Sequence, residues 1–277
     1  MRLALSTFVP ALGCCLSAAC AFQPGGVVDD SRLDAAAVTD DAPAASIDAR
    51  VIDAPAVPTD AAVSEGVIRA AALTAAPLLD GVATELAAST RYAMDLATAA
   101  NTEFVAGYTP SMSAGLRVGH DATHLHLLFD VIEAKPHSGD STSTWENDAI
   151  TFYIDSADDR AGAYGADDHE VIIDYRPVYG IYPATNGADP TIQSVRLPTA
   201  EGFTVEIRIA KATLGATLGA RIGFAWGVID DDGGGNADGY GLAYVRPAPR
   251  CASCCTAFSR AEAWCDTTML GEIALGD

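Results

Sequence analysis

The alternating run at residues 148–155 most constrains how this chain can fold. Ile150, Phe152 and Ile154 fall on one side of an extended backbone, and the residues between them fall on the other. A period of two predicts a half-buried β-strand with an apolar core face. Trp145 precedes this strand in a polar run. There it either covers a sheet edge or offers its ring to a ligand.

Further strand candidates recur along the chain, separated by clusters of Gly, Asn, Asp and Pro. With the first run they lie near 115–120, 124–132, 148–155, 170–176, 191–197, 203–210, 221–229, 240–245 and 270–275. A short helix is expected near 210–214, and 85–114 is expected to hold loops with a short helix. Trp226 shares a strand face with apolar neighbours and is expected in the core. The spacing predicts an all-β fold, an antiparallel β-sandwich of jelly-roll type.

Residues 1–20 have the pattern of an export signal, with Arg2 before an apolar run that is too short for a stable membrane anchor. The small residues that lead to Cys20 resemble a bacterial lipoprotein cleavage box, which implies lipidation at Cys20. The alternative is ordinary cleavage after Ala21. We therefore expect a chain anchored by lipid in the cell envelope, at the outer membrane or in the periplasm, or else a soluble periplasmic or secreted chain.

Residues 21–66 are rich in Ala, Asp and Pro, and Phe22 is their only aromatic residue. Such a segment cannot bury enough apolar surface to offset chain entropy, so it is expected to be a disordered tether before a folded domain at 67–277. The formal net charge of −21 argues against nucleic acid or an anionic lipid surface as a partner. The membrane is then expected to be reached only through the lipid at Cys20.

Four of the seven cysteines remain once the leader and Cys20 are set aside: Cys251, Cys254, Cys255 and Cys265. An even number in an exported chain indicates two disulfides. A bond between the adjacent Cys254 and Cys255 is disfavoured by geometry. Two pairings stay open: 251–254 with 255–265, or 251–255 with 254–265. A zinc ion on four cysteines is the competing interpretation.

The acidic loop at 230–239 is a candidate calcium site. Closely spaced carboxylates and amides with Gly between them can fold around a hard cation. The candidate ligands are Asp230, Asp232, Asn236 and Asp238. The alternative is a solvated hairpin loop, and the acidic pairs at 158–159 and 167–168 are weaker candidates.

An ordered set of short motifs resembles carbohydrate-binding module family 9 over about residues 67–277. The motifs are Leu79-Asp80-Gly81 with Glu85, the strand pair at 116–127, Trp145-Glu146-Asn147-Asp148, the acidic turn at 164–170, the strand at 202–209, the strand and loop at 222–232, and Trp264 before the closing strand at 270–275. The resemblance implies a β-sandwich related to the DOMON-type sandwich. It also implies that any bound calcium is structural.

The resemblance further implies that a sugar stacks between Trp145 and Trp264 without catalysis. The chain departs from the family at Thr151, where a carboxylate is common, and at Ile172 and Asp174, which replace an Arg and an Asn. The usual sugar preference therefore does not carry over. Polar groups that could contact the sugar hydroxyls instead are Asp174, Arg176, Glu170, Gln193 and Asp266. The expected partner is an oligo- or polysaccharide such as xylan. A separate glycoside hydrolase would carry out polysaccharide catabolism.

Two alternatives belong to other functional classes. Related sandwiches carry b-type haem on axial Met and His or Lys, and Met94, Met112 and Met269 make an electron-transfer protein conceivable. A structural envelope lipoprotein without a ligand is the other. The chain carries no nucleophile elbow, no Ser/His/Asp order and no zinc-protease motif, so no enzyme activity is expected.

Overall fold

The computed structural model describes residues 67–82, 84–99, 101–104, 106–136, 141–175, 179–183, 191–214, 221–233, 237–243, 263 and 265–275. The described residues form 13 strands and five short 3-10 helices. In this part of the chain, no helix is long and apolar enough to cross a membrane. The predicted leader and tether at 1–66 lie outside the described residues.

Two sheets make up the domain, and the first, sheet A, carries the predicted Trp145 strand. Its order is β8 (Tyr179–Pro183), β7 (Asp168–Asp174), β6 (Ala149–Asp155), β11 (Arg221–Asp230), β13 (Gly271–Leu275) and the start of β1 (Val67–Ala72). Beside the second half of β11 run β12 (Gly239–Ala243) and then β3 (Asn101–Phe104). All these pairs are antiparallel except β1 with β13.

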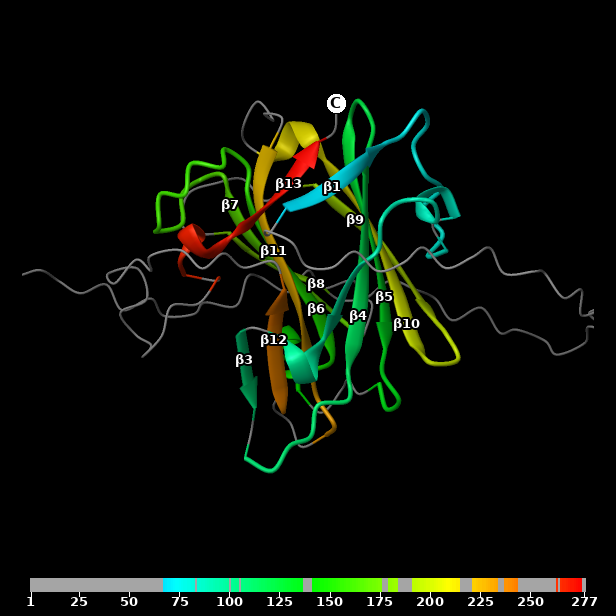
Figure 1. The fold of residues 1–277 in the computed structure, drawn as a ribbon, viewed down its shortest axis with the longest axis vertical. Coiled ribbons are helices and arrows are strands. Elements are labelled where there is room, and N and C mark those ends of the chain that lie inside the picture. The colour runs from blue at the N-terminus through cyan, green and yellow to red at the C-terminus, as the bar shows by residue number, and fades with distance from the viewer. Residues whose placement is uncertain are drawn as a thin grey trace, which may run out of the picture. The chain divides into compact units, whose positions relative to one another are not determined.

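Sheet B lies opposite sheet A (Figure 1). It consists of β2 (Tyr92–Asp95), β4 (Ser113–His120), β5 (His124–Ile132), β10 (Gly202–Ala210) and β9 (Ile192–Pro198). One strand joins the sheets, because the first four residues of β1 pair with β13 while Ala71 and Ala72 pair with β4. The 3-10 helices are η1 (Thr84–Leu86), η2 (Leu96–Thr98), η3 (Thr144–Glu146), η4 (Lys211–Thr213) and η5 (Thr267–Met269).

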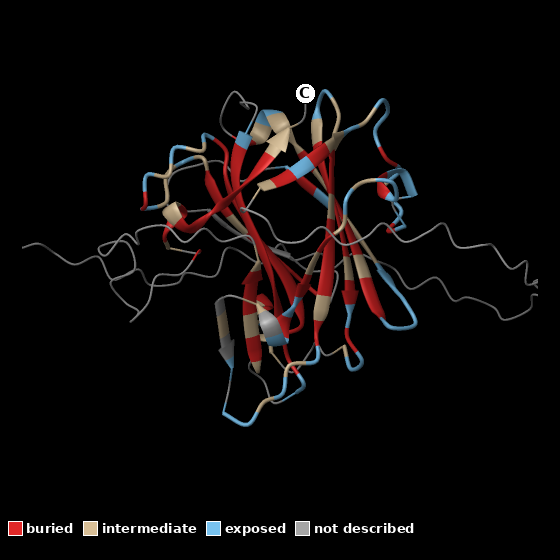
Figure 2. Cartoon of the chain, viewed as in Figure 1, coloured by how far each residue is buried: buried red, intermediate tan, exposed pale blue. Residues whose placement is uncertain are grey.

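The core fills the space between the sheets, where the strands are buried along most of their length (Figure 2). Phe129 of sheet B lies 5.5 Å from Trp226 and 6.3 Å from Phe152 of sheet A, measured between ring centroids. Trp226 has no exposed surface, which confirms its predicted place in the core. An all-β antiparallel sandwich is therefore confirmed.

The strand predictions hold with one correction and several omissions. All seven residues of β6 are buried, so the prediction of a half-buried strand is wrong. Its second face is covered by chain segments that the period of two cannot reveal. Strands β1 and β8 were not predicted, and the loops expected at 85–114 contain β2 and β3. The latter two have four residues each, which is too short for a readable alternation. The helix expected near 210–214 is the single turn η4.

The opening Leu-Asp-Gly turn is fastened to sheet B by one buried carboxylate. Glu206 accepts hydrogen bonds from the backbone N–H groups of Asp80 at 2.9 Å and Gly81 at 2.8 Å. Gly81 has a φ of +84°, a region that favours glycine. Two motifs that lie 125 residues apart in the chain are thus parts of one contact.

Candidate functional site

The face of sheet A that points away from the core carries the Trp145 motif, and we call it the outer face. Side chains directly opposite one another on paired strands point to the same side of a sheet. The outer face consists of the residues that alternate with the core-facing ones. They are Ala149, Thr151, Tyr153 and Asp155 on β6; Asp168, Glu170, Ile172 and Asp174 on β7; Ala225, Gly227 and Ile229 on β11; and Tyr240 and Leu242 on β12.

Trp145 lies on the outer face, in the turn η3 that leads into β6. Its ring is partly buried against Ala149, Ile172 and Ile229, beside Tyr240. The side chain is therefore neither a core residue nor a free one. One part of its surface is fixed by packing and another part is exposed, which is the arrangement that a stacking platform needs.

The Asn and Asp that follow Trp145 explain why the turn holds its shape. Asn147 Nδ2 donates to the carbonyl oxygen of Ser143 at 2.7 Å, which closes the turn around the tryptophan. Asp148 Oδ1 accepts from the backbone N–H of Asp231 at 2.7 Å and so ties the turn to the end of β11. Neither residue has exposed surface. The Trp-Glu-Asn-Asp motif thus presents one ring and anchors it with two buried polar side chains.

The C-terminal segment reaches the same face. Ala263, which precedes Trp264 in the sequence, is fully buried in a cluster with Tyr153, Ala225 and Leu242. Tyr240 packs against this cluster and also against the one that holds Trp145. Tyr240 therefore lies between the cluster that contains Ala263 and the cluster against which Trp145 packs. Trp264 itself lies outside the described residues, so the predicted clamp stays a prediction.

Hydroxyl and carboxyl groups lie between these two places. The hydroxyls of Tyr153 and Tyr240 are hydrogen-bonded at 2.9 Å. Glu170 is the cross-strand partner of Tyr153 and is only partly exposed. Burial raises the pKa of Glu170 to about 8, which favours the protonated form of this carboxyl group at neutral pH. A protonated carboxyl group both donates and accepts hydrogen bonds, as a sugar hydroxyl does.

The predicted polar contacts divide between the two sheets. Asp174 is fully buried on the outer face, 3.4 Å from Asn147 Nδ2. Gln193 lies on β9 of sheet B, where its amide oxygen accepts from Arg208 Nε at 2.9 Å, so the structure does not bring it to Trp145. Asp266 caps η5 through its bond to the backbone N–H of Thr268. Arg176 lies outside the described residues.

The predicted calcium ligands of the 230–239 loop have protein partners. Asp230 accepts from Tyr108 and from the backbone N–H of Met112, and burial raises its pKa. Asp232 faces Lys135 Nζ at 3.4 Å, and Asp238 Oδ2 accepts from the backbone N–H of Asp232 at 3.1 Å. Asn236 lies outside the described residues. Calcium in this loop stays a prediction.

A pocket of about 540 Å³ opens beside that loop. Its lining contains Tyr108, Ser111, Lys135, Asp232 and Asp238, together with small residues. The hydroxyl of Tyr108, its only aromatic residue, is bonded to the buried Asp230. Among the described residues, the lining of this pocket therefore offers no pair of flat rings for a sugar to stack between.

Cys265 is disulfide-bonded. The other cysteines of the chain lie outside the described residues, so neither the predicted pairing nor the zinc alternative is resolved. The candidate haem ligands have packing and hydrogen-bonding roles in the described structure. Met94 and Met112 lie in the main core cluster, and His126 Nε2 is 2.8 Å from Asp121 Oδ2.

Three tyrosines of the site were not singled out from the sequence. Tyr153 had a usable signal, because it alternates with the core residues of its strand. Tyr240 opens a predicted strand, and Tyr164 sits in the acidic turn. Tyr153 and Tyr240 meet because β11 pairs with both β6 and β12, and Tyr164 packs against the same cluster from the loop before β7. Strand order of this kind is not readable from one sequence.

An all-β sandwich with aromatic side chains gathered on one outer sheet face defines the class of the carbohydrate-binding modules. Within that class, the chain belongs to the family described as carbohydrate family 9 binding domain-like, whose model matches residues 79–277. A search of the curated proteins found no match.

Two solved structures of a family 9 carbohydrate-binding module from Caldicellulosiruptor kristjanssonii share the fold. The complex of that module with cellotriose is 18% identical, with a TM-score of 0.59, over 76% of this chain and 93% of that chain. Its complex with glucose is 19% identical, with the same TM-score of 0.59, over 76% of this chain and 96% of that chain.

Proposed function

We propose that this chain binds carbohydrate without catalysis, with a sugar ring held between Trp145 and Trp264 on the outer face. The observation that carries the proposal is that Tyr240 packs against both clusters of the outer face. Trp145 and Ala263, the neighbour of Trp264, belong to clusters that share this one side chain. Family membership and the sugars bound by the two similar modules give the same class of ligand.

The physical basis is the apolar face of a pyranose ring, whose C–H groups pack well on an indole. If each tryptophan removes roughly 50–100 Å² of apolar surface from water, each contributes about 1–2.5 kcal/mol. Two such faces support only weak to moderate affinity once the cost of association is subtracted. Hydroxyl recognition then falls to the partly exposed polar groups of this face, Glu170 and Tyr240.

The ligand we would test first is a glucose-based sugar end, because the similar modules were solved with glucose and cellotriose. Xylan fragments form the comparison set. Because Thr151 and Ile172 differ from the residues common in the family, the order of sugar preference has to be measured for this chain.

The test is a titration of the purified full chain with glucose, cellotriose and xylo-oligosaccharides, followed by tryptophan fluorescence and calorimetry. Trp226 is fully buried, so a change in emission reports on the other two tryptophans. Trp145→Ala and Trp264→Ala are each expected to weaken binding by roughly 5- to 70-fold, the equivalent of the stacking energy above.

Phe104→Ala is the matched control. Phe104 is an exposed aromatic residue of the same sheet, paired with Gly239 opposite Asp230 and so on the other side from Tyr240. It should leave affinity unchanged. Binding that survives Trp145→Ala at full strength would overturn the proposed site. The absence of any sugar response from the folded wild-type chain would overturn the function.

We also propose that the chain acts beside a separate glycoside hydrolase, held at the envelope by lipid on Cys20 and the tether at 21–66. The leader pattern and the tether composition support this, and both lie outside the described residues. A Cys20→Ser variant should move from the membrane fraction to the soluble fraction. An unchanged distribution would contradict lipidation at this residue.

A further inference from the structure

The chain has only two lysines, Lys135 and Lys211, and their surroundings differ. Lys135 Nζ lies 3.4 Å from Asp232 Oδ1, and its side chain is 74% exposed. Lys211 begins η4 directly after β10 and is only partly exposed. One molecule thus carries a solvated amine and a packed amine, so the first is an internal reference for the reactivity of the second.

Two acceptors hold the Lys211 amine in place. Its Nζ donates to the carbonyl oxygen of Asp121 at 2.6 Å and lies 3.2 Å from His120 Nδ1. The backbone N–H of Lys211 donates to the carbonyl oxygen of Thr123 at 2.9 Å, which fixes the start of η4 on the β4–β5 turn. A neutral amine has two hydrogens, and these two acceptors account for both. The nitrogen lone pair is then left for a reaction partner.

His120 presents its Nδ1 to this amine from a fixed position. It ends β4 and is the cross-strand partner of Ala72 on one side and Leu125 on the other. Leu125 belongs to the main core cluster, so the imidazole lies on the core side of sheet B, at the end of the strand. A neutral ring that accepts at Nδ1 carries its hydrogen on Nε2. The Nδ1 lone pair therefore faces Lys211 and can take a proton from it.

The surroundings favour the neutral, nucleophilic form of the amine. Burial lowers the pKa of Lys211, and the nearby Asp121 carboxylate opposes this only in part. Burial and the lysine charge also lower the pKa of His120, so its ring stays neutral beside the amine. The Asp121 carboxylate has other partners, since Oδ2 lies 2.8 Å from His126 Nε2 and Oδ1 accepts from the backbone N–H of Thr123.

We propose that Lys211 condenses with aldehydes, the open-chain form of an aldose among them, and that His120 moves the protons of that reaction. Lysines held partly out of water, with an amine that loses its proton readily, are the ones that form imines with carbonyl compounds. His120 and Asp121 are the titratable groups that the described structure places against the amine. Of these two residues, His120 is the one whose side chain touches the reacting nitrogen.

The reaction needs no oxidant or reductant. The Nζ lone pair attacks the carbonyl carbon, which forms the C–N bond and leaves a negative charge on the oxygen. His120 Nδ1 takes one proton from the nitrogen and returns it to that oxygen, which gives a carbinolamine. His120 then moves the second nitrogen proton to the hydroxyl group, which leaves as water while the C=N bond forms. Amine and aldehyde thus become imine and water.

The experiment treats the purified full chain with glyceraldehyde and sodium cyanoborohydride, which reduces the imine to a stable secondary amine. Peptide mass spectrometry measures the labelling of Lys211 relative to Lys135 in the same molecules. Lys211 should be labelled faster by about threefold or more, although it is the less exposed of the two. Glycerol, which has no aldehyde group, should label neither lysine. A Lys211 rate at or below that of Lys135 overturns the proposal, as does labelling with glycerol.

A substitution at His120 separates proton transfer from a structural role. His120→Asn keeps an oxygen acceptor beside Lys211 but cannot move protons, so aldehyde labelling of Lys211 should fall by about tenfold or more. Acetylation by acetic anhydride requires the neutral amine but no loss of water, so its Lys211-to-Lys135 ratio should change by less than about twofold. Unchanged aldehyde labelling, or an equal loss in both reactions, would overturn the role of His120.

His124→Asn is the matched control. His124 is a partly exposed histidine of the same turn, and its Nδ1 lies 2.8 Å from Thr123 Oγ1, not from the amine. Both ratios should stay at the wild-type values in this variant, and a loss equal to that of His120→Asn would overturn the assignment to His120. The inference does not rest on the proposed sugar site, so a chain that binds no sugar would still test it.

Discussion

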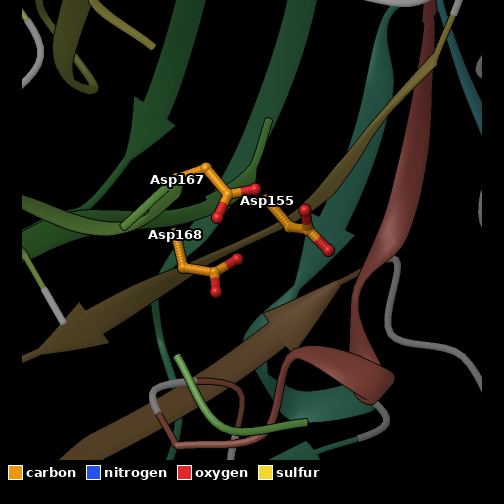
Figure 3. Close-up of side chains that lie close together, drawn as sticks. All are labelled: Asp155, Asp167 and Asp168. Carbon is orange, nitrogen blue, oxygen red and sulfur yellow. The ribbon is translucent and has the colours of Figure 1, made fainter. Parts of the chain in front are cut away.

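Two acidic regions border the outer face, and the structure treats them differently. In the 230–239 loop the aspartates are close in sequence, yet Asp230 bonds to Tyr108 and Met112 while Asp232 faces Lys135. In the cluster of Asp155, Asp167 and Asp168, which we call the β6–β7 cluster, Asp155 lies 12 residues before Asp167 in the chain, yet their carboxylates lie close together (Figure 3). Cross-strand register brings ligand atoms together more effectively than proximity along the chain.

The contrast also concerns what each buried carboxylate lacks. Both Asp168 and Asp230 are almost fully buried, and burial raises the pKa of each. Asp230 Oδ2 has a tyrosine hydroxyl and a backbone N–H as donors, whereas Asp168 Oδ2 has one backbone N–H and two carboxylates nearby. The Oδ1 atom of each residue has no hydrogen-bond partner among the described residues. The two carboxylates thus differ in the number of donors to one oxygen and in the like charge around them.

The largest loss of unfolding free energy is expected when one tyrosine beside each region loses its hydroxyl group. Tyr108→Phe leaves the buried Asp230 with one donor fewer and should cost about 1–3 kcal/mol of unfolding free energy. Tyr164→Phe removes a single bond to the Ala263 carbonyl and should cost about 0.5–1.5 kcal/mol. Urea unfolding of both variants measures these losses.

The variant that loses less stability should lose more sugar affinity. Tyr164→Phe loosens the segment before Trp264 and should weaken affinity, whereas Tyr108→Phe should leave it unchanged. Equal affinity in both variants would show that the Ala263 bond does not position the site.

Stability should also fall as the pH rises, and Asp230 contributes to this. Its folded-state pKa lies above the ordinary value of 3.8 because of burial. The folded chain therefore retains a proton that the unfolded chain has released, and it loses stability as pH increases from 3.8 through the folded-state pKa. Asp230→Asn should flatten the pH dependence relative to wild type. Unfolding free energies measured across this range provide the test, and an unchanged slope would contradict it.

Sequence patterns predicted the sheets well because alternation and turn residues act locally. The strand at 124–132 was predicted at both ends, and Trp226 was placed in the core correctly. Patterns failed where a partner decides the outcome. Residues 92–95 and 101–104 become strands only beside β4 and β12, and Tyr153 is buried only because other segments cover its face.

The site shows the same division. Trp145 was identifiable because a large aromatic residue in a polar run is unusual in itself. The β6–β7 cluster was divided in the sequence between a strand end and a turn, so only the 167–168 pair drew notice. Gln193 was grouped with Trp145 because a sequence does not show which sheet a strand joins, and the structure puts it on sheet B. One sequence shows which residue types occur in a local pattern. It does not show which distant residues the fold brings together.

The smallest effect is expected at the ion pair of the 230–239 loop. Lys135 Nζ lies 3.4 Å from Asp232 Oδ1, and the lysine side chain is 74% exposed. Water and salt screen such a pair, so Lys135→Ala should change the unfolding free energy by no more than about 0.5 kcal/mol. Urea unfolding at low and high salt measures it. A loss well above that size, abolished by salt, would show that this loop depends on electrostatic pairing as strongly as the cluster does. The distinction between a solvated acidic loop and a buried acidic cluster would then fail.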